Sequence, residues 1–454
     1  MSASTLELAQ RALGHLDGDG QATVTRERSL LLRYARSAPT QATDIDDTTV
    51  SLLALHDGHV GTAETNVLAD DALRDAARRA MAAARAAADA AGAAGDHPGL
   101  PEPPAAYRTH EGYDLRTARV DPAGGGAALG EVFAVAAERG LEAYGAWTTG
   151  AVETAIASTA GIAAVDRVTD AYLKVVLRDE HGRTGWDARA AVSERDIDAA
   201  ATARRAAAKV TGQEPAELPP GAYPVVLDAD AVGGLLEMLG WLAFNGLAHA
   251  EGRGALDGRL GTRIAAPAIN LSDSPRYAGT LPRAFDFEGV PKAPLPLIQD
   301  GVAHRVVHDS RSAARAGGGA RSTGHALAPG GSPHGPAPTN LVLIGGGAAD
   351  VDELAAPVER GIYVTRLWYL NVVHPKQTLL TGTTRDGTFL IEDGRISRPL
   401  RDVRFTDSVL RILQETEALT ASSRLVSEAE YYGRRFASGV VCPALRAGGF
   451  RVTG

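Results

Sequence analysis

Two histidines four residues apart form the most suggestive chemical motif of this chain, His304-Arg305-Val306-Val307-His308. On a helix this spacing lets two imidazoles hold a zinc ion, with an intervening carboxylate as the general base. Here the position of the base holds Arg305, a permanent cation that would repel the metal. The alternation of VAHRVVH predicts a strand, on which residues i and i+4 lie roughly 13 Å apart. We therefore interpret the pair as two polar strand residues and not as a zinc site.

A glycine run between a predicted strand and a helix-like stretch, LVLIGGGAADVDELAAPVERG at 341–361, is superficially similar to a phosphate-binding loop. A Walker loop needs Gly-Lys-Ser/Thr, but no lysine follows the glycines. A dinucleotide fingerprint needs Gly or Ala where Asp350 stands, and its charge would repel pyrophosphate. Nucleotide binding is therefore not expected.

Nucleophile motifs are also missing from the sequence. No Gly-x-Ser-x-Gly elbow occurs, and Cys442 stands in VVCPALRAGGF without a nearby histidine. Free cysteine is among the most buried residue types, and a reactive thiolate needs an electropositive setting. Cys442 is therefore interpreted as a small buried residue.

Composition excludes several classes of protein. The chain has 454 residues, 46 Lys+Arg against 55 Asp+Glu, a formal charge of -9 and one cysteine. Mean hydropathy is -0.10 and no window reaches the roughly 18 apolar residues of a membrane span. The acidic balance offers no surplus of cations for nucleic acid, and a single cysteine cannot form an internal disulfide. The start of the chain does not have the pattern of a signal peptide, so we expect a cytoplasmic protein with neither a membrane nor a nucleic acid as partner.

The elements that must position any site divide the chain into two expected domains, 1–218 and 219–454. In the first, residues 21–65 predict an antiparallel meander with a tight turn at Asp57-Gly58. Helices are expected at 70–92, 126–139 and 194–210, and successive strands at 141–159, 161–168, 170–179 and 184–192. The Gly- and Pro-containing stretch 211–224 is typical of a linker.

The second expected domain begins with a strand at 223–229 and a helix at 230–248. Residues 314–340 contain too many glycines and prolines for regular structure and predict a long loop. A hairpin with a turn at Asp393-Gly394, a helix at 406–419 and a last strand at 448–454 complete the pattern. The fold class is therefore α+β, with an N-terminal domain of antiparallel strands and helices and a C-terminal β-rich domain with few helices.

Several segments of the second domain, in their order along the chain, resemble the TldD/PmbA family. They are YPVVLDADAVGGLLEML at 223–239, APAINLSDSP at 266–275, FDFEGVPKAPLPLIQDGVAH at 285–304, SRSAARAGGGARSTGHA at 310–326, PTNLVLIGGG at 338–347, the stretch GIYVTRLWYLNVVHPKQTLLTGTTRDGTFLIEDGRI at 361–396, and VCPALRAGGFRVTG at the end.

The resemblance implies a mostly heterodimeric zinc peptidase, in which a TldD-type subunit carries His-Glu-x-x-x-His on the helix after this strand. The corresponding stretch here, Leu235 to Leu242, contains no histidine. That departure resembles the TldE (PmbA) subunit, which completes the chamber around the partner's zinc. The resemblance therefore implies no catalytic residue, metal ligand or cofactor in this chain, zinc in a TldD-type partner, and an extended peptide as substrate.

The Gly-rich loop and its flanks supply the candidate substrate-binding residues. An extended peptide could be held by backbone hydrogen bonds inside the chamber, with a wall formed by Arg311, Thr323, Gly324, His325 and Asn340.

Two alternative functions remain open. The chain could be a self-sufficient homodimeric hydrolase that uses His325, His374 or Cys442. It could also be a peptide-binding scaffold that never contacts a protease.

Overall fold

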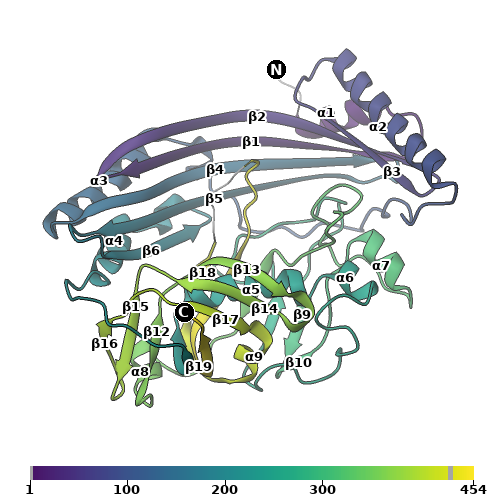
Figure 1. Ribbon diagram of the computed structural model, residues 1–454. Coiled ribbons are helices and arrows are strands. Elements are labelled where there is room, and N and C mark those ends of the chain that lie inside the picture. The colour runs from purple at the N-terminus through teal and green to yellow at the C-terminus, as the bar shows by residue number, and fades with distance from the viewer. Residues whose placement is uncertain (1–3, 428–432) are drawn as a thin grey trace.

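Two β-sheets, each with its own helices, form the protein, as the computed structural model shows for residues 4–427 and 433–454 (Figure 1). The first sheet has six strands and is formed by residues 20–191, whereas the second is formed by residues 221–452. In Figure 1 the long strands of the first sheet extend over the second domain. The α+β class predicted from the sequence is confirmed. The boundary at residue 218 stays a prediction.

The first sheet is antiparallel throughout, in the order β3-β2-β1-β4-β5-β6. The predicted meander is confirmed, and its turn at Asp57-Gly58 has the two positive φ angles, 48° and 74°, that a tight hairpin needs. The two strands expected at 161–179 are one continuous strand, since no glycine or proline interrupts them. The six strands are β1 (Gly20–Ala35), β2 (Ala38–His56), β3 (His59–Thr65), β4 (Glu142–Ser158), β5 (Ala163–Arg178) and β6 (Thr184–Ala191).

Within the part of the chain that the structure describes, four helices pack on the first sheet. The predicted helix at 70–92 is confirmed, and it ends at Gly92 in the left-handed conformation. Its alanine-rich face allows a close approach to the sheet: a Cβ added at Gly61 of β3 would lie 2.1 Å from the carbonyl oxygen of Ala80. The helices are α1 (Thr5–Leu13), α2 (Asp70–Ala91), α3 (Pro122–Glu138) and α4 (Ala199–Ala208).

The second sheet is mixed. β7 lies in its interior between β19, to which it is antiparallel, and β12, to which it is parallel, and its apolar run Val225-Val226-Leu227 is fully buried. The strands are β7 (Gly221–Leu227), β8 (Leu271–Asp273), β9 (Leu295–Gln299), β10 (Val302–Ala303), β11 (Asn340–Leu343), β12 (Arg360–Val364), β13 (Leu367–His374), β14 (Leu379–Thr384), β15 (Thr388–Glu392), β16 (Arg395–Pro399), β17 (Arg404–Ser408), β18 (Thr416–Val426) and β19 (Gly439–Val452).

Short helices accompany this sheet, and two predictions about them are wrong. The helix expected at 230–248 is broken after Phe244, because the Asn245 side chain accepts a hydrogen bond from the Ala248 amide at 3.0 Å and starts a new helix. The helix expected at 406–419 is a strand, one short helix and a further strand, because its ends pair with β14 and β19. The helices are α5 (Ala229–Ala243), α6 (Gly246–Ala250), α7 (Ser310–Ala316), α8 (Val351–Ala355) and α9 (Val409–Gln414).

The strand expected across His304 and His308 is also wrong. β10 ends at Ala303, since only its two residues pair with β9, and the chain then leaves the sheet. His304 is exposed, whereas His308 is mostly buried with its Nδ1 3.2 Å from the Ser312 hydroxyl. The two histidines therefore have different surroundings.

A buried ion pair links the segment before β19 to the first sheet. The guanidinium of Arg435 donates to both carboxylate oxygens of Asp170 on β5, at 2.7 and 2.8 Å, and to the Thr148 hydroxyl of β4 at 2.9 Å. The Arg435 amide also donates to Glu27 of β1. The segment before β19 is thereby anchored to the first sheet.

Among the described residues, every helix is too short or too polar to cross a membrane.

Candidate functional site

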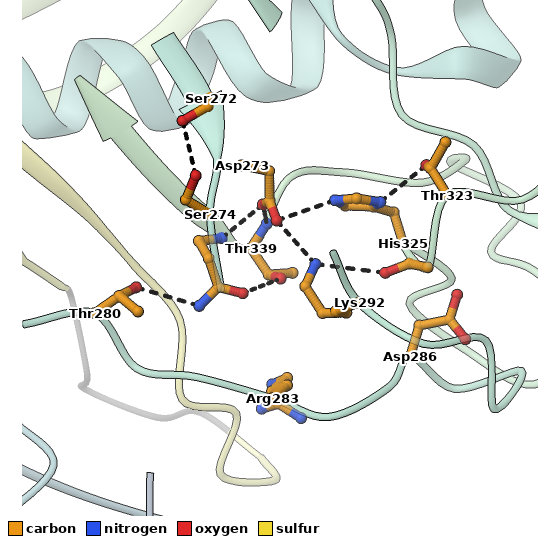
Figure 2. A network of polar contacts seen from close by, with 12 residues as sticks. Ser272, Asp273, Ser274, Thr280, Arg283, Asp286, Lys292, Thr323, His325 and Thr339 are labelled. Atoms are coloured by element: carbon orange, nitrogen blue, oxygen red, sulfur yellow. Dashed lines mark hydrogen bonds and ion pairs between the residues drawn. The ribbon is translucent and has the colours of Figure 1, made fainter. Parts of the chain in front are cut away.

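The carboxylate of Asp273, at the end of β8, is the centre of a buried polar network (Figure 2). Its Oδ1 lies 3.1 Å from Lys292 Nζ and 3.2 Å from His325 Nε2. Its Oδ2 accepts hydrogen bonds of 2.8 Å from the amides of Thr339 and Asn340. Asp273 therefore joins three segments that are far apart in the sequence.

Strand pairing puts Asp273 in this position. β8 pairs with β9 on one side and with β11 on the other, and Asp273 lies opposite Leu295 and Leu341. The Asn340 side chain, at the start of β11, donates to the Leu281 carbonyl at 2.6 Å. The network thus holds the beginning of β11 against the loop that follows β8.

The His325 side chain is oriented by the residues just before it. Thr323 Oγ1 lies 2.9 Å from His325 Nδ1, and the backbone of Thr323 pairs with His308. Gly324 has a φ of +78°, and a Cβ at this position would lie 2.6 Å from the Pro291 carbonyl oxygen. Only glycine fits this turn without strain.

The network contains one anion and one cation. Burial alone would raise the pKa of Asp273, but Lys292 and His325 beside it hold that pKa far below its usual range. Burial lowers the pKa of Lys292 although Asp273 raises it. Burial and the charge of Lys292 lower the pKa of His325, so this imidazole is neutral at pH 7.

A pair of buried carboxyl groups, Asp286 and Glu288, lies next to this network. Asp286 accepts hydrogen bonds from the amides of Glu288, Val290 and Ala326, yet burial raises its pKa to about 6. Burial and the nearby Asp286 raise the pKa of Glu288 to about 8, so Glu288 is mostly protonated at pH 7.

A small cavity of about 20 Å³, enough for roughly one water molecule, lies between the network and the first sheet. The guanidinium of Arg283 lies 3.9 Å from the centre of the Phe436 ring, and Phe287 stacks on the same Phe436 ring with 6.1 Å between the centroids. The cavity thus combines charged groups with aromatic walls, and its lining includes Thr154 of β4, Asp166 of β5, Phe285, Lys292, Gly324 and His325.

A larger hollow continues from this cavity to the exposed side of α5. Glu237, Gly240 and Trp241 of α5 line it, and Trp241 is 40% exposed. The two hollows share Leu327, Thr339 and Phe436.

The comparisons with known proteins agree on one family. Residues 220–454 match the model of the PmbA/TldA metallopeptidase C-terminal domain, and residues 22–84 match the model of domain 1. The chain belongs to the PmbA/TldD metallopeptidase family. It is 27% identical over 208 residues to a metalloprotease of Methanothermobacter thermautotrophicus, covering 46% of this chain and 44% of the relative. It is 26% identical over 276 residues to a metalloprotease TldD homolog of Haemophilus influenzae, covering 58% and 55%. The chain thus spans about half the length of these curated relatives.

Solved structures share the fold over almost the whole chain. TldE from Thermococcus kodakarensis matches with a TM-score of 0.86 at 20% identity, over 99% of this chain and 100% of that one. A putative modulator of a DNA gyrase from Thermotoga maritima matches with a TM-score of 0.81 at 20% identity, over 96% of both chains.

The α5 residues of this PmbA/TldD-family chain do not fit a zinc ion. The helix offers Glu237 as its one ligand of the required type near the hollow, with buried Leu236 before it and Trp241 four residues after it. In residues 4–427 and 433–454, no three His, Cys, Asp or Glu side chains are placed to hold a metal.

Four of the five candidate wall residues lie together in the Asp273 network: Thr323, Gly324, His325 and Asn340. Arg311 lies elsewhere, because its guanidinium pairs with Asp96 at 3.0 Å. The role of the five in binding substrate stays a prediction.

Sequence reasoning missed Asp273, Lys292 and Asp286, which hold the network and the cavity together. All three lie within the segments that resemble the family, and Lys292 is one of only four lysines in the chain. A lysine in an apolar, proline-rich stretch of a chain with so few lysines could have been singled out as a candidate site residue. Its partner, Asp273, is known only from the fold.

The three residues considered for a self-sufficient hydrolase, His325, His374 and Cys442, have different surroundings in the structure. Cys442 is buried with its Sγ 3.2 Å from the Ala229 carbonyl oxygen, and burial raises the pKa of its thiol to about 12. His374 is exposed at the end of β13, whereas His325 is buried in the network. The interpretation of Cys442 as a small buried residue is confirmed.

Proposed function

We propose that this chain is the non-catalytic, TldE-like subunit of a heterodimeric zinc metallopeptidase that degrades or trims unfolded or ribosomally made, modified peptides. One observation supports this most strongly: α5 carries buried Leu236 just before Glu237 and Trp241 four residues after it, where a TldD-type subunit would carry histidines. The zinc and the water that it activates would then come from a TldD-type partner in the cytoplasm.

The chain's own contribution is the shape of the chamber. The Asp273 network fixes the position of Gly324 and His325, which line the cavity next to the α5 hollow. We propose that an extended peptide lies in the α5 hollow, and that Thr323 and Asn340 act as positioning residues beside it. Arg311 would contact the peptide only if the peptide reaches the surface near Asp96.

Reconstitution with a TldD-type subunit that carries His-Glu-x-x-x-His tests the proposal. We expect a complex by size exclusion and hydrolysis of an unfolded peptide by the mixture. Neither chain alone should hydrolyse it at a comparable rate. Hydrolysis by this chain alone would support the homodimeric hydrolase, whereas failure to form any complex would support the scaffold.

The zinc content of the isolated chain distinguishes the non-catalytic subunit from the self-sufficient homodimeric hydrolase without any activity assay. After exhaustive dialysis we expect the isolated chain to retain zinc far below one ion per chain, because α5 has no imidazole ligand. Stoichiometric zinc in elemental analysis would contradict the non-catalytic role.

A further inference from the structure

The α5 hollow, in which the peptide is proposed to lie, has walls made mostly of apolar side chains. Its volume is about 380 Å³, which falls within the roughly 300–1,000 Å³ of ordinary ligand pockets. Residues of α5, of the loop before β11 and of the start of β19 line it. The large apolar side chains among them are those of Trp241, Leu327, Pro338, Leu341, Phe436 and Val440.

The polar side chains of the hollow are hydroxyls and one carboxylate. Thr339, Ser427 and Ser438 carry the hydroxyls, and the Ser427 hydroxyl donates to the Ser438 carbonyl at 2.8 Å. Glu237 lies on the exposed face of α5. Within the described part of the chain, none of the lining residues is Lys, Arg or His. A ligand carboxylate buried among these residues would therefore lack a cationic partner, and burial of an unpaired charge is costly.

Trp241 gives the hollow an aromatic wall that is open to solvent. It is 40% exposed, whereas Trp147 and Trp186 are only 3% and 7% exposed. An exposed indole in a concave apolar site gains contact area when an apolar side chain covers it, and it has little conformational freedom to lose. The Trp241 ring is thus the surface that an apolar ligand would remove from water.

We propose that Trp241 is the specificity-determining residue of the hollow, and that it selects extended peptide segments with a large apolar side chain. The lining identifies this occupant, because burial of apolar surface favours an apolar side chain and the shortage of cations disfavours an acidic one. Large apolar side chains are mostly buried in folded proteins, so the same preference would direct the chain to unfolded segments. The inference rests on the proposed position of the peptide and specifies the class of peptide.

Binding of short peptides to the isolated chain tests this preference. The probes are fluorescein-labelled peptides of Ser and Thr that differ only in a central residue, which is Phe, Ser, Glu or Lys. We expect the Phe peptide to bind at least about tenfold more tightly than the other probes by fluorescence anisotropy, because only its central side chain gains from leaving water. Its affinity should change little as salt is raised, since no ion pair contributes to it.

Variants of the two exposed tryptophans locate the binding. Trp241→Ala should weaken binding of the Phe peptide by about tenfold, whereas Trp241→Phe should retain most of it because an aromatic wall remains. Trp368→Ala is the matched control, since Trp368 is 37% exposed and does not line the hollow. The Phe peptide should also shift the tryptophan emission to shorter wavelength in the wild type and in Trp368→Ala, but not in Trp241→Phe.

Several results would overturn the proposal. Equal affinity for the Phe and Ser peptides would remove the apolar preference, and a Lys peptide that binds as tightly as the Phe peptide would make Glu237 the determinant. Unchanged peptide binding by Trp241→Ala would remove the location. If that variant instead lost self-association, the hollow would be an interface between copies of the chain. A failed reconstitution of hydrolysis bears only on the proposed subunit role, because the binding assay needs no partner.

Discussion

Replacement of Lys292 by methionine is the sharpest test of the Asp273 network. The ammonium group is buried and lies 3.1 Å from Asp273 Oδ1, and methionine retains most of the apolar stem. Removal of the ammonium leaves a buried carboxylate that keeps the amides of Thr339 and Asn340 and a His325 imidazole whose pKa is lowered by burial. Breaking one side of a buried ion pair costs about 3–5 kcal/mol of folding free energy. We expect a loss of that size at about pH 8, where imidazole is neutral.

The loss should be smaller at about pH 6, and this dependence distinguishes the network from simple packing. Without Lys292, one cause that lowers the pKa of His325 is gone, and Asp273 then favours the imidazolium. The unfolded histidine is the same in both chains, so a folded-state pKa of His325 that is higher in the variant than in the wild type makes the stability difference between them smaller as the pH falls through that pKa.

Urea unfolding of the variant and the wild type at both pH values measures this directly. Lys376→Met is the control, because Lys376 and its partner Asp257, 3.6 Å away, are both about half exposed. We expect the control to lose at most about 1 kcal/mol at either pH. If Lys292→Met costs no more than the control, or the same at both pH values, the electrostatic account of the network is wrong.

Three further variants test other parts of the site. Cys442→Ser should lower the free energy of unfolding by about 1 kcal/mol. The wild-type thiol should react slowly with iodoacetamide at neutral pH while the protein is folded, because burial raises its pKa to about 12. Rapid labelling of the folded protein would contradict this. Glu288→Gln should gain stability relative to the wild type as the pH rises from 4.5 to about 8, because folded Glu288 keeps a proton that the unfolded chain releases above its ordinary pKa of 4.5. Parallel stability profiles would argue against the raised pKa. Gly324→Ala should lower the melting temperature clearly more than Gly318→Ala. Both glycines have a positive φ, but only at Gly324 would an added Cβ meet a carbonyl oxygen, that of Pro291 at 2.6 Å. Equal changes in melting temperature would mean that the turn at Gly324 can relax.

The order of periodic segments was enough to predict much of the fold. The alternation in 21–65, the alanine-rich helix at 70–92 and the Asp393-Gly394 turn are local signals, and the structure confirms each of them. Of the loop predicted at 314–340, residues 317–339 have neither helix nor strand, whereas residues 314–316 belong to α7 and Asn340 begins β11. The missing histidines of α5 are also a property of the sequence itself, because a side chain that is absent cannot be supplied by folding.

Tertiary contacts decided the remainder. The segment 406–419 has the composition of a helix, but its ends form strands because β14 and β19 offer them pairing partners. Asp273, Lys292 and His325 are separated by tens of residues, and their mutual charge, burial and pKa values exist only once β8, β9 and β11 pair. The stacking of Arg366 between residues of two sheets is likewise invisible in the sequence. Local patterns depend on neighbours along the chain, whereas a buried polar site depends on which distant segments exclude water together.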